Sequence, residues 1–309
     1  MTVPMLESLR AAFLDRPVPD AVFELAPGRL CGLRLSARGR PPRSRVILPV
    51  AAGVLTPSFD RPNVADAAAV GGAIERGKSA LGLGGGTVSL LIPDPCVRVF
   101  IMIIESLPGP QAERDAFIRW RVGKQMPLLP EDLRLAYAVA PGGPSRKVIV
   151  SAARAAVVRE YEGLFESAGL RVGAVTIPSL SLVNLIDLCP GTNGILLDIE
   201  ADILSFLAIM DSGWTLYRQK GLGPGLSAEA KADLVINEVE NTVHFIEDKE
   251  RKKVERIWVR AASGAEGPAV VARLSGTLSL SAATVDYRAP EDWDEREAAV
   301  LAPLMGQVV

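Results

Sequence analysis

Hydrophobic residues between positions 194 and 218 form three apolar runs separated by short polar turns. Runs of this length joined by tight turns predict consecutive β-strands. The first predicted strand carries Asp198 near its end, and Glu200 opens the turn that follows. We therefore place the rest of the chain relative to a three-stranded unit that begins at Gly194.

A similar hairpin is predicted near the start of the chain. Apolar residues between 22 and 35 flank a Pro–Gly pair, which is a strong turn signal. Glu24 lies near the end of the first strand of this hairpin. A helix over 66–81 and two apolar strands between 88 and 104 are predicted to follow.

The pattern changes after residue 104. A helix from Pro110, two strands around a Pro-Gly-Gly-Pro turn, a helix at 153–168 and a strand that ends at Thr176 follow one another. Gly169 stands directly after the second helix, where a left-handed residue is favoured. These about 70 residues have the size of an inserted subdomain.

The last third of the chain alternates between helix and strand patterns. It predicts a helix from Ser227 to Glu247, a strand at 256–260, a helix around 268–274, a strand near Thr284 and a helix at 295–305. The sequence Gly221-Leu-Gly-Pro-Gly225 leads directly into the first of these helices. A glycine-rich loop at a helix N-terminus can bind an anion, and a simple tight turn is the alternative.

Composition excludes several classes of function. With 309 residues and 49% hydrophobic residues, the chain can form two domains or one large bilobed one. The net charge is −2 and aromatic residues make up 5%, so general attraction to nucleic acid is not expected. His244 is the only histidine, and it flanks the apolar stripe of the Ser227 helix, so we expect neither histidine catalysis nor a histidine metal site.

Cysteine spacing and hydropathy indicate where the protein resides. Cys31, Cys96 and Cys189 are odd in number and widely separated, which argues against a disulfide framework or a zinc site and for a reducing compartment. The first residues lack a basic segment followed by an apolar core, and no apolar run reaches the length of a membrane span. We therefore expect a soluble, cytoplasmic protein.

An ordered series of short motifs resembles the PilM family, the cytoplasmic actin-like proteins of type IV pilus assembly. The motifs are Val88-Ser-Leu-Leu-Ile-Pro-Asp94, Cys96-Val-Arg-Val-Phe100, Glu105-Ser-Leu-Pro108, Ile118-Arg-Trp-Arg-Val122, Met126-Pro127, Glu131-Asp132, Tyr137-Ala-Val139 and Ala168-Gly-Leu170. The likeness runs from about residue 21 to the C-terminus and is best between 88 and 222. More distantly, the chain resembles the cytoplasmic domain of GspL and the division protein FtsA.

This resemblance implies an α/β chain with a bilobed actin-like fold, also called ribonuclease H-like. The two lobes would have duplicated mixed sheets, and a small α+β subdomain would be inserted into the first. The expected boundaries are 1–104 for the first lobe with return segments 177–192 and 295–309, 105–176 for the inserted subdomain, and 193–294 for the second lobe.

The nucleotide loops depart from the pattern that the resemblance implies. Active relatives place a glycine after Asp-Ile in each phosphate turn, because a residue without a Cβ lets the backbone approach a phosphate. This chain has Glu24-Leu-Ala26 and Asp198-Ile-Glu200 instead, and Arg260-Ala-Ala-Ser-Gly264 keeps one of the two adenosine glycines. The candidate cofactor-binding residues of this degenerate cleft are Glu24, Asp198, Glu200, Gly223, Gly225 and Gly264. We expect no catalytic residue, no metal site and no cofactor beyond weak binding of ATP with Mg²⁺.

The resemblance also implies partners. PilM-like proteins are understood to hold the cytoplasmic N-terminal tail of PilN, a single-span inner-membrane protein, with the first lobe and the inserted subdomain. The candidate contact residues are Val97, Val99, Phe117, Trp120, Val148 and Val150, although Phe117 and Trp120 also fit a role as subdomain core. The pilus motor ATPase is a second implied partner, and such partners would recruit the protein to the inner membrane.

Two other functions remain open at this stage. One is an active ATPase or a sugar-kinase-like phosphotransferase with the same fold, which would need intact phosphate glycines and a carboxylate base. The other is a filament-forming actin homologue. The sequence also leaves open whether the machine is a pilus, a type II secretion system or a DNA-uptake system.

Overall fold

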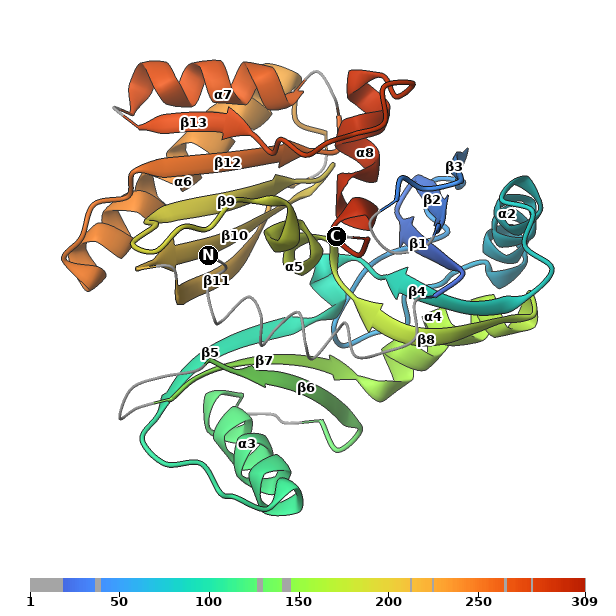
Figure 1. Ribbon diagram of the computed structural model, residues 1–309, viewed down its shortest axis with the longest axis horizontal. Helices are drawn as coiled ribbons and strands as arrows, with labels where there is room; N and C mark the ends of the chain where they lie inside the picture. Colours follow the sequence, from blue (N-terminus) through green and yellow to red (C-terminus); the bar gives the residue numbers. More distant parts are fainter. Residues whose placement is uncertain are drawn as a thin grey trace.

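The computed structural model describes residues 19–36, 40–126, 130–140, 146–211, 213–223, 225–263, 266–278 and 280–308. These residues form two lobes, each built on a five-stranded sheet, and a smaller unit built on a three-stranded sheet. In Figure 1 the second lobe lies at the upper left, the first lobe at the right and the smaller unit below them.

The first lobe combines an antiparallel hairpin unit with two parallel strands. Its strands are β1 (Ala21–Ala26), β2 (Arg29–Arg34), β3 (Ser44–Pro49), β4 (Gly86–Leu91) and β8 (Leu170–Thr176). They lie in the order β3-β2-β1-β4-β8, with β4 parallel to β1 and β8 parallel to β4. Gly28 has φ +80° in the turn between β1 and β2, a backbone conformation that glycine adopts without steric cost.

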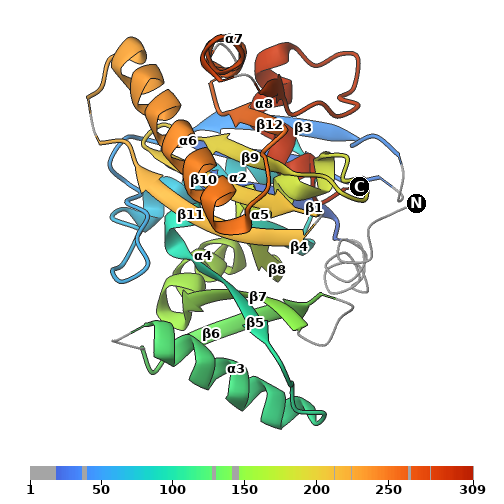
Figure 2. The ribbon, with the colours of Figure 1, turned by 90° about the vertical axis from the view of Figure 1, so that its left-hand side faces the viewer.

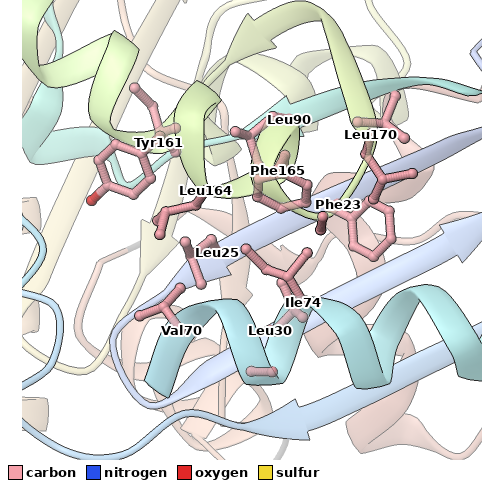
Figure 3. Close-up of a cluster of buried hydrophobic side chains, with 14 of the residues drawn as sticks. Phe23, Leu25, Leu30, Val70, Ile74, Leu90, Tyr161, Leu164, Phe165 and Leu170 are labelled. Carbon is pink, nitrogen blue, oxygen red and sulfur yellow. The ribbon is translucent and has the colours of Figure 1, made fainter. Parts of the chain in front are cut away.

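Side-chain alternation along β1 gives the sheet two buried faces. Phe23 and Leu25 point to the face covered by α2 (Ala67–Ala80) and α4 (Ala155–Ser167), as Figure 3 shows. The ring centroids of Phe23 and Phe165 are 5.3 Å apart. Val22 belongs to a different cluster on the other face of the sheet. Because each large apolar side chain contributes roughly 1.5–3 kcal/mol when it is fully buried, this two-sided burial fixes the register of the strand.

The second lobe repeats the same topology. Its strands are β9 (Gly194–Ile199), β10 (Ile203–Met210), β11 (Gly213–Gly221), β12 (Arg256–Ala261) and β13 (Ser281–Thr284), in the order β11-β10-β9-β12-β13. Helices α6 (Ala228–Glu250) and α7 (Glu266–Thr277) cover one face (Figure 1). The predicted three-stranded unit is confirmed, and the repeated topology confirms the prediction of a bilobed actin-like fold.

Two short helical segments pack between the lobes. They are α5 (Pro178–Leu182), which continues as a 3₁₀ turn at Val183–Leu185, and α8 (Glu295–Met305). Within the expected return segment 177–192, the α-helix therefore ends at Leu182. The Ser181 hydroxyl donates a 2.6 Å hydrogen bond to the Pro303 carbonyl. One apolar cluster combines side chains of both sheets with these two helices, so it joins the lobes.

The smaller unit is a three-stranded antiparallel sheet with one helix on its outer face (Figure 2). Its elements are the strands β5 (Arg98–Ile104), β6 (Leu133–Val139) and β7 (Arg146–Arg154), in the order β5-β7-β6, and the helix α3 (Gln111–Gln125). The observed boundaries of this inserted unit differ from the expected ones at both ends. Strand β5, expected in the first lobe, pairs with β7 of the inserted sheet, whereas α4 and β8, expected in the insert, belong to the first lobe.

Candidate functional site

The turns that follow β1 and β9 lie at a wide cleft between the lobes. The cleft has a volume of about 1650 Å³, and its lining includes Pro27, Gly28 and Arg29 from the first lobe and Glu200 and Ala201 from the second. Glu24 and Asp198 lie on the strands that lead into these turns, and both are almost completely buried. The equivalent position of the two hairpins in a duplicated fold brings the acidic residues together.

Arginine side chains occupy the space between the two turns. The Arg29 guanidinium donates hydrogen bonds of 2.7 and 2.8 Å to the two carboxylate oxygens of Glu200, and a third of 2.5 Å to Glu24 Oε1. Two parallel N–H···O bonds between one guanidinium and one carboxylate are stronger and more directional than a single bond. Because Arg29 belongs to the first lobe and Glu200 to the second, this pair connects the lobes.

A second arginine shares Glu200 with Arg29 and also pairs with Asp198. Arg260, at the end of β12, donates a 2.9 Å hydrogen bond to Asp198 Oδ1 and also pairs with Glu200. Its remaining N–H groups donate to the backbone carbonyls of Ala299 and Val300 at 2.9 and 3.2 Å. We call Glu24, Arg29, Asp198, Glu200 and Arg260 the interlobe ion network.

Burial and pairing shift the pKa values of this network in opposite directions. Burial alone would raise the pKa of Glu200, but Arg29 and Arg260 lower it to about 2. For Asp198 burial prevails over Arg260, and the pKa rises to about 6. Glu200 is therefore the permanently charged partner of both guanidinium groups.

A further polar cluster lies beside the network, and the sequence analysis did not predict it. Asp94 follows β4 and is buried; it accepts a 2.5 Å hydrogen bond from the Ser205 hydroxyl and a 3.3 Å bond from the Ser179 backbone N–H. Burial, and then the nearby charge of Asp198, raise the pKa of Asp94 to about 7. Gln219 donates a 2.8 Å bond to the Asp94 carbonyl. The available sequence signal was the Pro93-Asp-Pro95 step at the end of β4.

The glycine candidates lie apart from the network. Gly223 and Gly225 have φ values of +79° and +76°, with no neighbouring atom near an added Cβ. Ser227 caps α6 by accepting a 3.2 Å hydrogen bond from the Ala230 backbone N–H. Neither glycine is among the described residues that line the cleft, and Gly264 lies outside the residues that the structure describes.

The expected partner-binding residues divide into three groups. Val148 and Val150 are completely buried in the core between the inserted sheet and α3. Val99 and Phe117 are partly buried, whereas Trp120 is 53% exposed, with its ring centroid 5.9 Å from that of Phe117. Only Val97 of the six lines a groove, a hollow of about 310 Å³ between the first lobe and the inserted sheet.

Comparison with known proteins gives the fold its context. No protein-family model and no curated protein sequence matches the chain. A solved chain of the "PilM-PilN type IV pilus biogenesis complex" is 16% identical with a TM-score of 0.79, over 94% of this chain and 98% of that one. The cytoplasmic domain of EpsL, an inner-membrane component of the type II secretion system of Vibrio cholerae, is 12% identical with a TM-score of 0.51, over 93% of each chain.

A third solved structure carries the name of the fold. It is a Bacteroides thetaiotaomicron protein with an actin-like ATPase fold, 8% identical with a TM-score of 0.55 over 99% of both chains. None of the described helices combines the length and the apolar character that crossing a membrane requires.

The structural comparisons show that the chain has the bilobed actin-like fold and that its structure is similar to that of PilM.

Proposed function

We propose that the protein is a non-catalytic, cytoplasmic scaffold subunit of a type IV pilus or related type II secretion machine. In this role it binds the N-terminal tail of a single-span, PilN-like inner-membrane protein and is recruited to the membrane through that contact. The extended structural likeness to a PilM chain solved in a PilM–PilN complex supports the proposal. Two features of the chain itself, one in the cleft and one in the groove, agree with it.

The interlobe ion network is the feature that argues against nucleotide turnover. A triphosphate needs uncommitted N–H donors and cations between the two turns. Here Arg29 and Arg260 are already paired with carboxylates, and Glu200 stands where a phosphate would approach the second turn. Binding ATP there would break charge-assisted bonds and place phosphate beside carboxylate, which is unfavourable. The residues present do not fit the nucleotide.

The groove beside the inserted subdomain is the observation that supports peptide binding most directly. Strand β8 is last in the order of the first-lobe sheet and β6 is last in the order of the inserted sheet, and both line the groove. Apolar residues that include Val97, Leu135 and Val172 form much of its wall. An extended peptide can pair its backbone with such a strand and place alternate side chains in apolar pockets. The tail of a membrane protein would therefore lie between the two sheets.

One ion pair spans this groove and gives it a polar rim. Arg134 of β6 donates hydrogen bonds of 2.9 and 3.0 Å to the two carboxylate oxygens of Glu162 on α4. The pair is partly exposed, so it contributes little to folding stability. A bound peptide can therefore replace it with its own polar contacts at small cost.

A calorimetric titration with synthetic N-terminal tails of single-span proteins encoded nearby tests the proposal. Ala136 is exposed and lines the groove, so Ala136→Glu places a charge where apolar side chains would bind. We expect this variant to raise the Kd at least about tenfold, which corresponds to about 1.4 kcal/mol. Ala112→Glu, the same change on the exposed surface of α3, is the control and should leave the Kd unchanged. Equal affinity of both variants would exclude the groove as the binding site.

A further inference from the structure

A smaller cavity of about 240 Å³ adjoins the interlobe ion network. It shares Pro27, Glu200 and Ala201 with the wide cleft, and Asp94 lies in its wall. Five of its lining residues are prolines, four are acidic, and none is Lys, Arg or His. The volume is below the range that is usual for drug-sized ligands. A ligand of this cavity must be small, and it would contact both carboxylate groups and the apolar faces of proline rings.

The cluster around this cavity carries more negative than positive charge. Five carboxylates surround it or lie directly behind it, on Glu24, Asp94, Asp198, Glu200 and Asp202. Among the described residues, the guanidinium groups bonded to them belong to Arg29 and Arg260. Asp94 is held by neutral donors, the Ser205 hydroxyl and the Ser179 backbone N–H. Even when Asp94 is protonated, the four other carboxylates outnumber the two guanidinium groups among the described residues, so part of the negative charge is uncompensated.

Glu24 supplies an independent indication of a missing partner. Its side chain is 1% exposed and lines the cavity, and only its Oε1 atom is bonded, to Arg29. Its Oε2 atom is buried and has no hydrogen-bond partner. An unpaired buried polar atom costs roughly 1–3 kcal/mol, and more when it is charged, so native structures rarely keep one without a ligand or a water. Because Glu24 lines the cavity, a donor group bound there would lie beside this carboxylate.

We propose that this proline-walled cavity between the lobes binds an organic cation, an ammonium or a guanidinium group. Such a group donates several N–H bonds to carboxylates while its apolar atoms lie against the proline rings. A bare metal ion fits less well, because no group of His, Cys, Asp and Glu side chains among the described residues has the geometry to hold one. The interlobe site would thus accept a positive charge, opposite to the charge of a nucleotide triphosphate.

The cation can come from a free small molecule or from a lysine or arginine side chain of another protein. Calorimetry and thermal unfolding with 1,4-diaminobutane and with L-arginine amide, at constant ionic strength, test the first source. Short peptides that carry one lysine or, at the same position, norleucine test the second. Tetramethylammonium has the charge without N–H donors, so it is the control ligand and should neither bind nor raise the Tm.

Two variants locate the site. Asp202→Asn changes an exposed residue of the cavity wall and should leave folding intact, while Glu24→Gln removes the charge of the unpaired carboxylate. We expect each to raise the Kd of the bound cation about tenfold, as loss of a charge-assisted hydrogen bond does. Asp187→Asn removes the same charge from an exposed residue that does not line the cavity, and it should change nothing.

The outcomes distinguish the two sources of the cation from each other and from general charge screening. Binding of the free diamine or of the lysine peptide, weakened by Asp202→Asn but not by Asp187→Asn, supports the site and identifies its source. The proposal is overturned if none of the cations binds at a concentration of about 10 mM, because that concentration is far above the Kd of ordinary ligands. An equal loss in Asp202→Asn and Asp187→Asn overturns it too, because the effect would then be general screening. Peptide-tail binding in the groove, which Ala136→Glu reports, is independent of either result.

Discussion

Arg260 is the residue on which the interlobe ion network depends most. Only 2% of its surface is exposed, and it contacts Asp198, Glu200 and two backbone carbonyls. Burial opposes its charge, yet the neighbouring carboxylates outweigh burial and raise its pKa. Each ion in such a group is tolerated in the interior only because its partners are present. The network therefore fixes a geometry more than it adds net stability.

Replacing Arg260 with Met keeps similar side-chain bulk and removes the charge. Asp198 and Glu200 then remain buried with less compensation, and we expect the free energy of unfolding to fall by about 3–5 kcal/mol. Urea unfolding followed by circular dichroism measures the change. Arg256→Met on the same strand is the control, because that arginine is exposed and should cost less than about 1 kcal/mol. A loss for Arg260→Met no larger than that of the control would contradict the role assigned to the network.

The pKa of Asp94, raised to about 7 chiefly by burial, makes stability depend on pH. The folded state then holds a proton that the unfolded state releases near pH 4, so stability falls as pH rises from about 4 to about 7. With about 1.4 kcal/mol per pKa unit, the fall is on the order of 4 kcal/mol. Asp94→Asn resembles the protonated form and should lose this part of the pH dependence. If the free energy of unfolding depends on pH in the same way in both proteins between about pH 4 and about pH 7, the raised pKa of Asp94 is disproved.

At the level of the element, local patterns predicted what depends on local sequence. The strands between 194 and 218 and the helix after Ser227 were found where alternation and helical spacing placed them. The assignment of β5 and β8 to the wrong units has a physical cause, because strand pairing joins residues far apart in sequence. The apolar pattern of β5 is the same whether it pairs with β4 or with β7.

The candidate site shows the same division between local and long-range information. Glu24 and Asp198 were predicted because each lies near the end of the first strand of a hairpin, and Glu200 because it opens the turn after Asp198. Arg29 and Arg260 were not predicted, because contacts between strands and between lobes bring them to the carboxylates. Arg260 lies opposite Asp198 in the pairing of β12 with β9, and Arg29 bonds to Glu200 of the other lobe. Val148 and Val150 were assigned to a surface because period-two alternation does not reveal which face a helix covers.

The contact between α5 and α8 gives the element-level prediction. Gly306 ends α8, and a Cβ added there would overlap the Ser181 carbonyl group. Gly306→Ala must therefore push the two segments apart, and we expect a loss of about 1–3 kcal/mol in thermal or urea unfolding. Gly276→Ala in α7 has no neighbouring atom near the new Cβ and should be neutral or stabilising by up to about 1 kcal/mol. The opposite order of the two variants would show that α8 does not pack as described.

Across the whole molecule, several contacts among the described residues join two lobes of the same topology. The cluster around α5 and α8 joins their sheets, Arg29 pairs with Glu200 between the two turns, and Gln219 of β11 donates to the Asp94 carbonyl of the first lobe. In the function that we propose, no nucleotide is needed to hold the lobes together, because Arg29 and Arg260 already pair with Glu200 between the two turns. The protein should therefore present its groove permanently rather than in response to ATP.

The most direct test is a calorimetric titration of a cognate N-terminal membrane-protein tail into the protein, with and without Mg²⁺ and ATP. We expect the tail to bind with the same Kd in both conditions, Mg²⁺ and ATP alone to release no binding heat, and Ala136→Glu to abolish or strongly weaken binding of the tail. Tail binding that requires ATP, or micromolar binding of ATP itself, would contradict a nucleotide-independent scaffold.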